Sequence, residues 1–287
     1  MSQELNYYPT GRVLQFRGAI PAVYEIASEK FITLSYDGTT LALSSTPLNR
    51  EGGQIVSADN RASIPLGMQY PAIWTGTAGD KLLITAYSSY EYLSLIIIVD
   101  LNTYQYWRYR GPDFRSRPIG IHRNIIYLSS RINDQSLITG FDLTTGQTES
   151  QYRANDVYGM LGKTPNGEPL AAVLERESIN GTPVIRIVNI LDEDVLIEME
   201  GDVKILSVKE NGVIFTESNG DYYFVDYQAV KYRLNFIDNG PGLRDQQIKI
   251  VGSSDSGDSI WLGPMVPSDG KRIINYKLQT YRNSQTL

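Results

Sequence analysis

Cysteine is absent from the sequence, and histidine occurs once, at His122. Disulfide scaffolds and cysteine-ligated metal or redox centres are thereby excluded. A catalytic triad or a histidine-ligated metal would depend on His122 alone, and no serine lies in the G-x-S-x-G pattern of a nucleophile elbow to accompany it. We interpret His122 as a structural residue at the end of a strand, and we expect no cofactor and no metal ion.

Long hydrophobic runs are also absent. The longest, residues 93–99, includes a serine and is the length of a strand, whereas a membrane helix needs roughly 20 apolar residues. The first residues carry neither the basic start nor the apolar middle of a secretory signal peptide. The sequence therefore predicts no contact with a membrane, and a chain located in the cytoplasm or in a virion assembled there.

The charge balance is only mildly acidic, with 26 basic and 32 acidic residues and a net charge of −6. This balance argues against nucleic acid as a partner of the whole surface, although a local basic patch would survive the average. Residues 253–259 space two carboxylates as a loose calcium loop would, but they lack the complete EF-hand pattern. We interpret this segment as a turn between strands.

What the chain does contain is β-forming sequence. Segments 30–36, 81–87 and 221–227 are short, rich in β-branched and aromatic residues, and bounded by turn residues that tolerate positive φ. No window of twelve or more residues combines apolar residues at helical spacing with capping residues. The sequence therefore predicts an all-β chain whose strands are joined mainly by antiparallel hairpins.

A repeat emerges when the ends of these strands are aligned. Four segments share one plan, which is an apolar strand, then Asp or Asn, then an apolar residue and a turn. The Asp or Asn positions are 100, 142, 189 and 226, so they lie 42, 47 and 37 residues apart. This spacing suits the four-stranded sheet, or blade, of a β-propeller, which is about 40 to 50 residues long.

Residues 141–147, Phe-Asp-Leu-Thr-Thr-Gly-Gln, resemble the strand-end segment of the quinoprotein- and kelch-like β-propeller repeats. The period of the repeat extends over the whole chain, but the motif itself matches only a few residues in each blade. The resemblance therefore implies a fold and not a particular family. On this basis residues 1–287 are expected to form a single propeller domain. The six expected blades are residues 22–60, 71–111, 117–153, 157–201, 202–236 and 247–287.

The last blade has only three evident strands, at 248–252, 259–262 and 272–278, while residues 12–17 form a strand with no blade of their own. A propeller must close into a ring, because an open edge leaves unpaired backbone groups. We therefore predict a six-bladed propeller of four-stranded antiparallel blades in which the N-terminal strand completes the last blade. A seven-bladed ring is the alternative, and it requires further strands within residues 49–70.

Catalytic carboxylates are scarce where a propeller hydrolase would need them. Such an enzyme requires two carboxylates that converge at the ring axis, and among the expected innermost strands only Glu25 is acidic. An enzyme acting on carbohydrate would have to pair Glu25 with Asp59, Asp80 or Asp202. This scarcity favours a protein without catalytic residues.

Charge and tyrosine supply the candidate contact residues. Six arginines interleaved with aromatic residues fall between 108 and 131, and six acidic residues without a basic one fall between 192 and 202. Three tyrosines between 87 and 92 are expected beside a turn, where β-propensity alone does not explain them. The candidate interaction residues are Arg108, Arg110, Arg115, Arg117, Tyr87, Tyr90, Tyr92, Asp192 and Asp194.

The two charged sectors admit three interpretations: head-to-tail contact between copies that closes into a ring, capture of an anionic ligand, or ordinary solvated strands. Together with the scarce chemistry, they favour a non-enzymatic protein-interaction or assembly module that contacts other protein subunits in a homo- or hetero-oligomer. The cysteine-free, tyrosine-rich composition resembles that of structural components of a phage virion or tail. The alternatives are a carbohydrate-active enzyme and a propeller that recognises a glycan or a nucleic acid without turnover.

Overall fold

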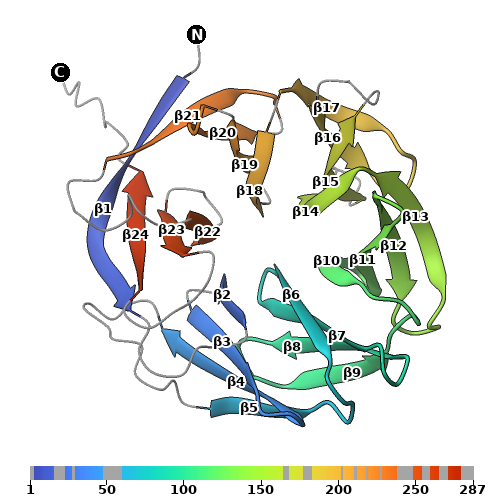
Figure 1. Ribbon diagram of the computed structural model, residues 1–287. Coiled ribbons are helices and arrows are strands. Elements are labelled where there is room, and N and C mark those ends of the chain that lie inside the picture. The colour runs from blue at the N-terminus through green and yellow to red at the C-terminus, as the bar shows by residue number, and fades with distance from the viewer. Residues whose placement is uncertain are drawn as a thin grey trace.

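The computed structural model describes residues 3–15, 23–27, 30–47, 60–163, 168–176, 183–201, 203–209, 212–217, 219–226, 228–237, 248–253, 259–264 and 271–278. Every regular element in these ranges is a β-strand, and the strands stand in antiparallel groups of four around a central axis (Figure 1). The chain is therefore a β-propeller, and the prediction of an all-β fold is confirmed.

In each blade the chain runs outward from the strand next to the axis. Blade one comprises β2 (Val23–Ala27), β3 (Lys30–Tyr36), β4 (Thr40–Pro47) and β5 (Asn60–Pro65), and blade two comprises β6 (Ala72–Ala78), β7 (Lys81–Ser88), β8 (Leu93–Asp100) and β9 (Tyr106–Arg110). Blade three comprises β10 (Arg117–His122), β11 (Ile125–Ile132), β12 (Gln135–Asp142) and β13 (Thr148–Ala154), and blade four comprises β14 (Asp156–Lys163), β15 (Pro169–Arg176), β16 (Pro183–Asn189) and β17 (Val195–Glu200). Blade five comprises β18 (Val203–Lys209), β19 (Gly212–Glu217), β20 (Tyr222–Asp226) and β21 (Lys231–Phe236), and blade six comprises β22 (Ile248–Ser253), β23 (Ser259–Pro264), β24 (Arg272–Leu278) and β1 (Gln3–Gln15).

The ring is held by apolar layers, one between each pair of neighbouring blades. Successive side chains of a strand point to opposite faces of its sheet, so Leu82 and Ile84 of β7 pack toward blade one whereas Leu83 packs toward blade three. The layer that closes the ring brings Leu14 of β1 against Phe31 of blade one. Because both faces of each sheet are covered, the middle strands read as nearly continuous apolar runs.

The described strands account for six blades, and each innermost strand contacts the innermost strand of the next blade all the way round the ring. Of residues 49–70, where a seventh blade would have needed its strands, Asn60–Pro65 forms the outer strand of blade one, while residues 49–59 lie outside the described ranges. The blade divisions predicted from the sequence thus match the sheets that the structure describes.

The N-terminal strand completes blade six, as predicted, and it is longer than the predicted 12–17. It starts at Gln3, and residues 16 and 17 lie outside the described ranges. Its pairing with β24 is interrupted by a bulge between Pro9 and Val13, within which Gly11 has a φ of 80°. Proline and glycine usually end a strand, but the bulge accommodates both and lets the strand continue.

The first part of β1 also pairs with blade five. Residues 3–7 run parallel to residues 232–236 of β21, so that blades five and six share one eight-stranded sheet. Tyr7 lies where the two pairings meet; it is 3% exposed, and its ring centroid is 5.4 Å from that of Phe236. The N-terminal strand therefore clasps two blades, as the blue ribbon in Figure 1 shows.

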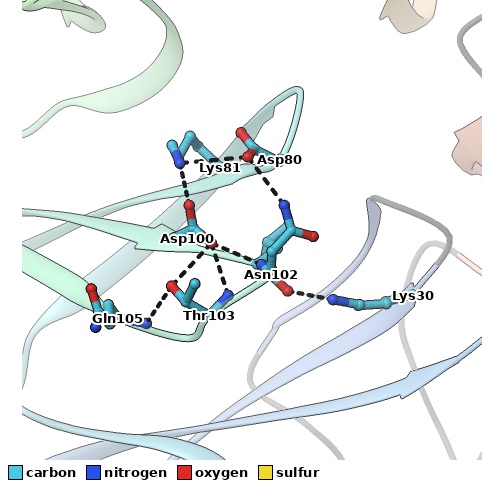
Figure 2. Close-up of polar contacts among 8 residues, drawn as sticks. Lys30, Asp80, Lys81, Asp100, Asn102, Thr103 and Gln105 are labelled. Carbon is cyan, nitrogen blue, oxygen red and sulfur yellow. Dashed lines mark hydrogen bonds and ion pairs between the residues drawn. The ribbon is translucent and has the colours of Figure 1, made fainter.

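The repeated Asp or Asn closes the turn between the third and fourth strands of a blade. In blade two, Asp100 Oδ1 accepts hydrogen bonds from the backbone N of Asn102 and of Thr103, both at 2.9 Å (Figure 2). The residues at 142, 189 and 226 likewise accept a backbone N–H from the residue two positions on. The motif that revealed the period is therefore a structural one.

This turn also joins neighbouring blades. Lys81 forms an ion pair with Asp100, and Lys30 of blade one donates to the carbonyl oxygen of Leu101 (Figure 2). The ammonium group of Lys81, together with the backbone donors, holds the pKa of Asp100 well below its usual range. Asp100 thus remains ionised and stabilises the turn at physiological pH.

Candidate interaction surface

The ring has two faces, and the candidate residues divide between them. We name the face where the innermost strands begin the start face; it carries the connections between blades and the turns between second and third strands. The opposite, end face carries the remaining turns. The candidate tyrosines and arginines belong to the start-face side of blades two and three, whereas Asp192 and Asp194 belong to the end face of blade four. Asp192 and Asp194 therefore lie on the opposite face from the candidate arginines.

Two of the four candidate arginines bridge neighbouring blades. Arg108 of β9 donates from Nη2 to the carbonyl oxygen of Leu66 at 3.0 Å, in the connection from blade one. Arg117, at the start of β10, donates to the carbonyl oxygen of Val157, near the start of β14. Both guanidinium groups thus stabilise contacts between blades. The contact of Arg117 also shows that the innermost strands β10 and β14 begin on the same side of the ring.

Arg110 and Arg115 are exposed, as is Arg108. Arg110 Nη2 lies 3.5 Å from Asp113 Oδ1, in a pair whose side chains are both largely in solvent. Such a pair contributes little to stability. The guanidinium carbon of Arg115 lies 4.9 Å from the centroid of the Trp74 ring, a cation–π contact on the innermost strand of blade two. Both cations remain accessible to a partner.

Exposed tyrosines accompany them on the same face. Tyr90 and Tyr92, in the turn between β7 and β8, are 75% and 74% exposed, and Tyr70, in the connection from β5 to β6, is 86% exposed. Tyr87, grouped with them on sequence, lies inside β7 and is half-buried. Sequence reasoning missed Tyr70, whose signal was its position directly before Pro71 in a segment without a clear strand pattern.

The connection that carries Tyr70 is fixed to the blades on both sides. The hydroxyl of Tyr36 in blade one donates to the carbonyl oxygen of Met68 at 3.2 Å, and Ser88 Oγ in blade two donates to that of Gln69 at 2.7 Å. Burial raises the pKa of Tyr36, so this phenol remains a hydrogen-bond donor. Tyr70 therefore projects from an anchored loop.

Arg110 ends β9, and Arg115 lies in the connection from β9 to β10 on the same face. Arg110 pairs in register with Leu95 at the start of β8, and the backbone N of Gly111 donates to the carbonyl oxygen of Ser94 at 2.9 Å. The connection 111–116 thus begins beside the turn that holds Tyr90 and Tyr92. We name these five residues, Tyr70, Tyr90, Tyr92, Arg110 and Arg115, the tyrosine–arginine surface.

Two of its tyrosines have an unfavourable backbone conformation. Tyr70 and Tyr92 have φ angles of 47° and 49°, in the left-handed region that favours glycine. Tyr104, on the end face, also has a positive φ, but its hydroxyl is 2.6 Å from Ser45 Oγ. Among the described residues, Tyr70 and Tyr92 have no such side-chain contact. The fold thus holds these rings in solvent at a conformational cost.

The residues considered for catalysis lie on different elements where the structure describes them. His122 ends β10, as the sequence predicted, and it is buried. Asp80 lies in an end-face turn, where Asn102 Nδ2 donates to it at 3.2 Å. Glu25 lies on β2. Its other two suggested partners, Asp59 and Asp202, are outside the described ranges.

One acidic residue of an innermost strand was missed. The innermost strand β14 begins at Asp156, one residue before the predicted start of blade four. Its carboxylate accepts a hydrogen bond from the backbone N of Val157 at 2.8 Å. The statement that only Glu25 is acidic on the innermost strands is therefore wrong by this one residue, because a strand boundary slipped.

No three His, Asp or Glu side chains of the described ranges are grouped so as to hold a metal ion. Within those ranges there is also no helix with the length and apolar character needed to cross a membrane.

Comparison with known proteins finds similarity of fold. No family model and no curated protein matches the chain. Among solved structures, the uncharacterized protein lmo1340 from Listeria monocytogenes EGD-e is 12% identical with a TM-score of 0.50, covering 84% of this chain and 77% of that one. The β-propeller domain of the Trilobed protease from Pyrococcus furiosus is 11% identical with a TM-score of 0.48, covering 85% of this chain and 77% of that one. The Dos1 propeller is 14% identical with a TM-score of 0.45, covering 90% of this chain and 68% of that one.

Identities this low concern the fold and not the activity. The β-propeller fold fits a protein-interaction module, but the fold by itself specifies no activity. The function therefore has to be argued from the surface of this chain.

Proposed function

We propose that this protein is a non-enzymatic interaction module whose tyrosine–arginine surface binds another protein. The observation that carries the proposal is that three tyrosines, 74% to 86% exposed, and two exposed arginines lie on the start face of blade two and of its connections to blades one and three. Tyrosine and arginine are the residue types most enriched at binding hot spots. Both are long, partly apolar and capable of directed hydrogen bonds.

Pre-organisation adds to the grouping. The loops that carry Tyr70 and Tyr92 are anchored by Ser88, which donates to Gln69 and accepts from the backbone N of Glu91 at 3.3 Å. A partner that docks here has little loop freedom to remove, so a larger share of the contact energy becomes affinity. The unfavourable φ of both tyrosines is consistent with a conformation kept for binding.

The chemistry of the surface specifies its partner. Arg110 and Arg115 carry positive charge, and the three tyrosine rings offer apolar faces with a hydroxyl at the edge. A complementary protein surface presents carboxylates together with apolar side chains. We extend the proposal to assembly: the partner is a subunit of a larger particle, such as a phage virion or tail, for which the support is the cysteine-free, tyrosine-rich composition.

Peptide and glycan arrays probed in parallel with the full chain test the proposal. We expect binding to peptides that combine Asp or Glu with apolar residues, and weaker binding as salt rises, because exposed charges are screened over about 8 Å at physiological ionic strength. The variant Tyr70→Ser/Tyr90→Ser/Tyr92→Ser should lose this binding. Ile132→Ser, which removes another exposed apolar side chain from blade three, is the matched control.

Glycan binding without peptide binding would contradict the proposal and support the carbohydrate-recognising alternative. Hydrolysis of any glycan on the array, lost in Glu25→Ala, would support the enzyme. The extension to a particle is tested separately, by whether the chain sediments with an assembly far above 32.2 kDa when isolated from its natural source.

A further inference from the structure

A second exposed apolar surface lies on the end face of blade four. Leu191, Val195 and Leu196, in and just after the turn between β16 and β17, are 52%, 47% and 51% exposed. Single exposed aliphatic side chains are ordinary, but three within six residues form a patch that water covers unfavourably. We name these three the aliphatic patch.

Blade three shows that the fold does not require this patch. Both blades have the same turn, and both have a bulge in the outer strand, at Leu196 in blade four and at Glu149 in blade three. Subtracting 47 from the residue number aligns the two blades. The residues of blade three that correspond to Leu191, Val195 and Leu196 are Thr144, Thr148 and Glu149, all exposed. Polar side chains thus serve the same backbone equally well.

Acidic residues are interleaved with the aliphatic patch. Asp192, Glu193 and Asp194 occupy the turn between Leu191 and Val195, and all three are exposed. The surface therefore combines carboxylates with apolar side chains. These are the features that the tyrosine–arginine surface requires of its partner, and they occur on the opposite face of the same molecule.

We infer that the occupant of the aliphatic patch and its carboxylates is the tyrosine–arginine surface of a second copy of this chain. The inference rests on the proposed function and names its partner. Arg110 and Arg115 of one copy then face Asp192 and Asp194 of the next, while the tyrosine rings cover the aliphatic patch. Both complementarities, of charge and of apolar area, are satisfied by a single contact.

The placement of the two surfaces determines the assembly. A contact between unlike surfaces is heterologous, and because they lie on opposite faces, each added copy leaves one of each unused. The copies therefore form an open stack and not a closed ring, which was one of the three interpretations of the charged sectors. Two blade positions of six separate the surfaces, so coaxial copies are turned by about 120° from one to the next.

Sedimentation of three proteins tests the inference. The wild-type chain should show a mass that rises with concentration and falls with added salt. The first variant, Leu191→Thr/Val195→Thr/Leu196→Glu, takes its residues from blade three and so preserves the fold. The second, Arg110→Glu/Arg115→Glu, alters the other surface. Each variant alone should remain monomeric, with an association at least about tenfold weaker than wild type.

An equimolar mixture of the two variants is the decisive measurement. The second variant keeps its aliphatic patch and the first keeps its tyrosine–arginine surface, so the mixture should form a dimer and nothing larger. If the first variant does not melt at the wild-type temperature, the variant Asp192→Lys/Asp194→Lys takes its place. A wild-type chain that is monomeric at about 100 μM, or a mixture that stays monomeric, would overturn the inference. Acidic peptides that still bind a monomeric wild-type chain would leave the proposed function standing.

Discussion

Replacing Tyr7 by alanine should destabilise the whole ring, because this side chain packs where β1 joins blades five and six. Tyr7 is 3% exposed and lies in one apolar cluster with Ile214 and Leu234 of blade five and Ile260 and Tyr276 of blade six. Removing a large buried aromatic ring costs about 3 to 5 kcal/mol, since the transfer free energy is lost and a cavity remains.

The expected fall in melting temperature follows from the size of the chain. An unfolding entropy of about 2.1 cal/mol/K per residue gives about 0.6 kcal/mol/K for a chain of this length, so the loss corresponds to roughly 5 to 8 °C. Differential scanning calorimetry measures it. The neighbouring Tyr8→Ala is the matched control, because Tyr8 points to the other side of β1 and is only half-buried.

We expect Tyr8→Ala to lower the melting temperature by less than half as much as Tyr7→Ala. Equal falls would mean that the apolar layer between blades five and six does not distinguish the two faces of β1. A Tyr7→Ala protein that melts with the wild type would refute the clasp, since the ring would then be stable without this contact.

Three further outcomes are expected. Deletion of residues 1–17 should expose the edges of β21 and β24 and cause aggregation, seen by light scattering; a truncated chain that melts cooperatively at the wild-type temperature would contradict this. Asp100→Ala should lower the free energy of unfolding in urea at pH 7, an effect that shrinks in acid because a depressed pKa contributes stability only while the carboxylate is ionised. Asp100→Asn should cost less, because Asn189 closes the same turn in blade four; an equal cost would show that the turn acceptor is unimportant. Glu175 accepts a hydrogen bond from Tyr152 at 3.3 Å, and burial raises its pKa. The fold thus favours the neutral form of Glu175, so the stability that this form contributes is present in acid and is lost as the pH rises through the raised pKa. Glu175→Gln should therefore raise the stability of the protein at pH 7 and have little effect at pH 4. A less stable variant at pH 7 would show that the charge is needed.

Local patterns were sufficient to predict the fold. Strand sequence and turn residues predicted the all-β class, and the Asp or Asn at 100, 142, 189 and 226 predicted the period, because that side chain closes a turn within a few residues of itself. The closing role of the N-terminal strand followed from the missing fourth strand of blade six. Its true length did not, since the bulge at Pro9 and Gly11 depends on pairing with residues more than 260 positions away.

Four of the five residues of the tyrosine–arginine surface could be predicted from the sequence, and Tyr70 could not. Tyr90, Tyr92, Arg110 and Arg115 were predicted to be contact residues, and the structure places them in exposed positions. Nothing local distinguishes Arg108 and Arg117, whose side chains bridge blades, from the arginines beside them. That distinction depends on which carbonyl oxygen the neighbouring blade brings within reach.

The sequence alone determined the strands, their period and the composition of the surface, since each depends on contacts between residues close in the chain. Only the tertiary structure decided which side chains meet and which face they occupy. Tyr70 joins Tyr90 and Tyr92 because a connection from blade one is anchored on Ser88 of blade two. Asp192 and Asp194 lie on the opposite face from Arg110 and Arg115 because strand direction reverses at every turn, a property of the assembled sheet and not of any one segment.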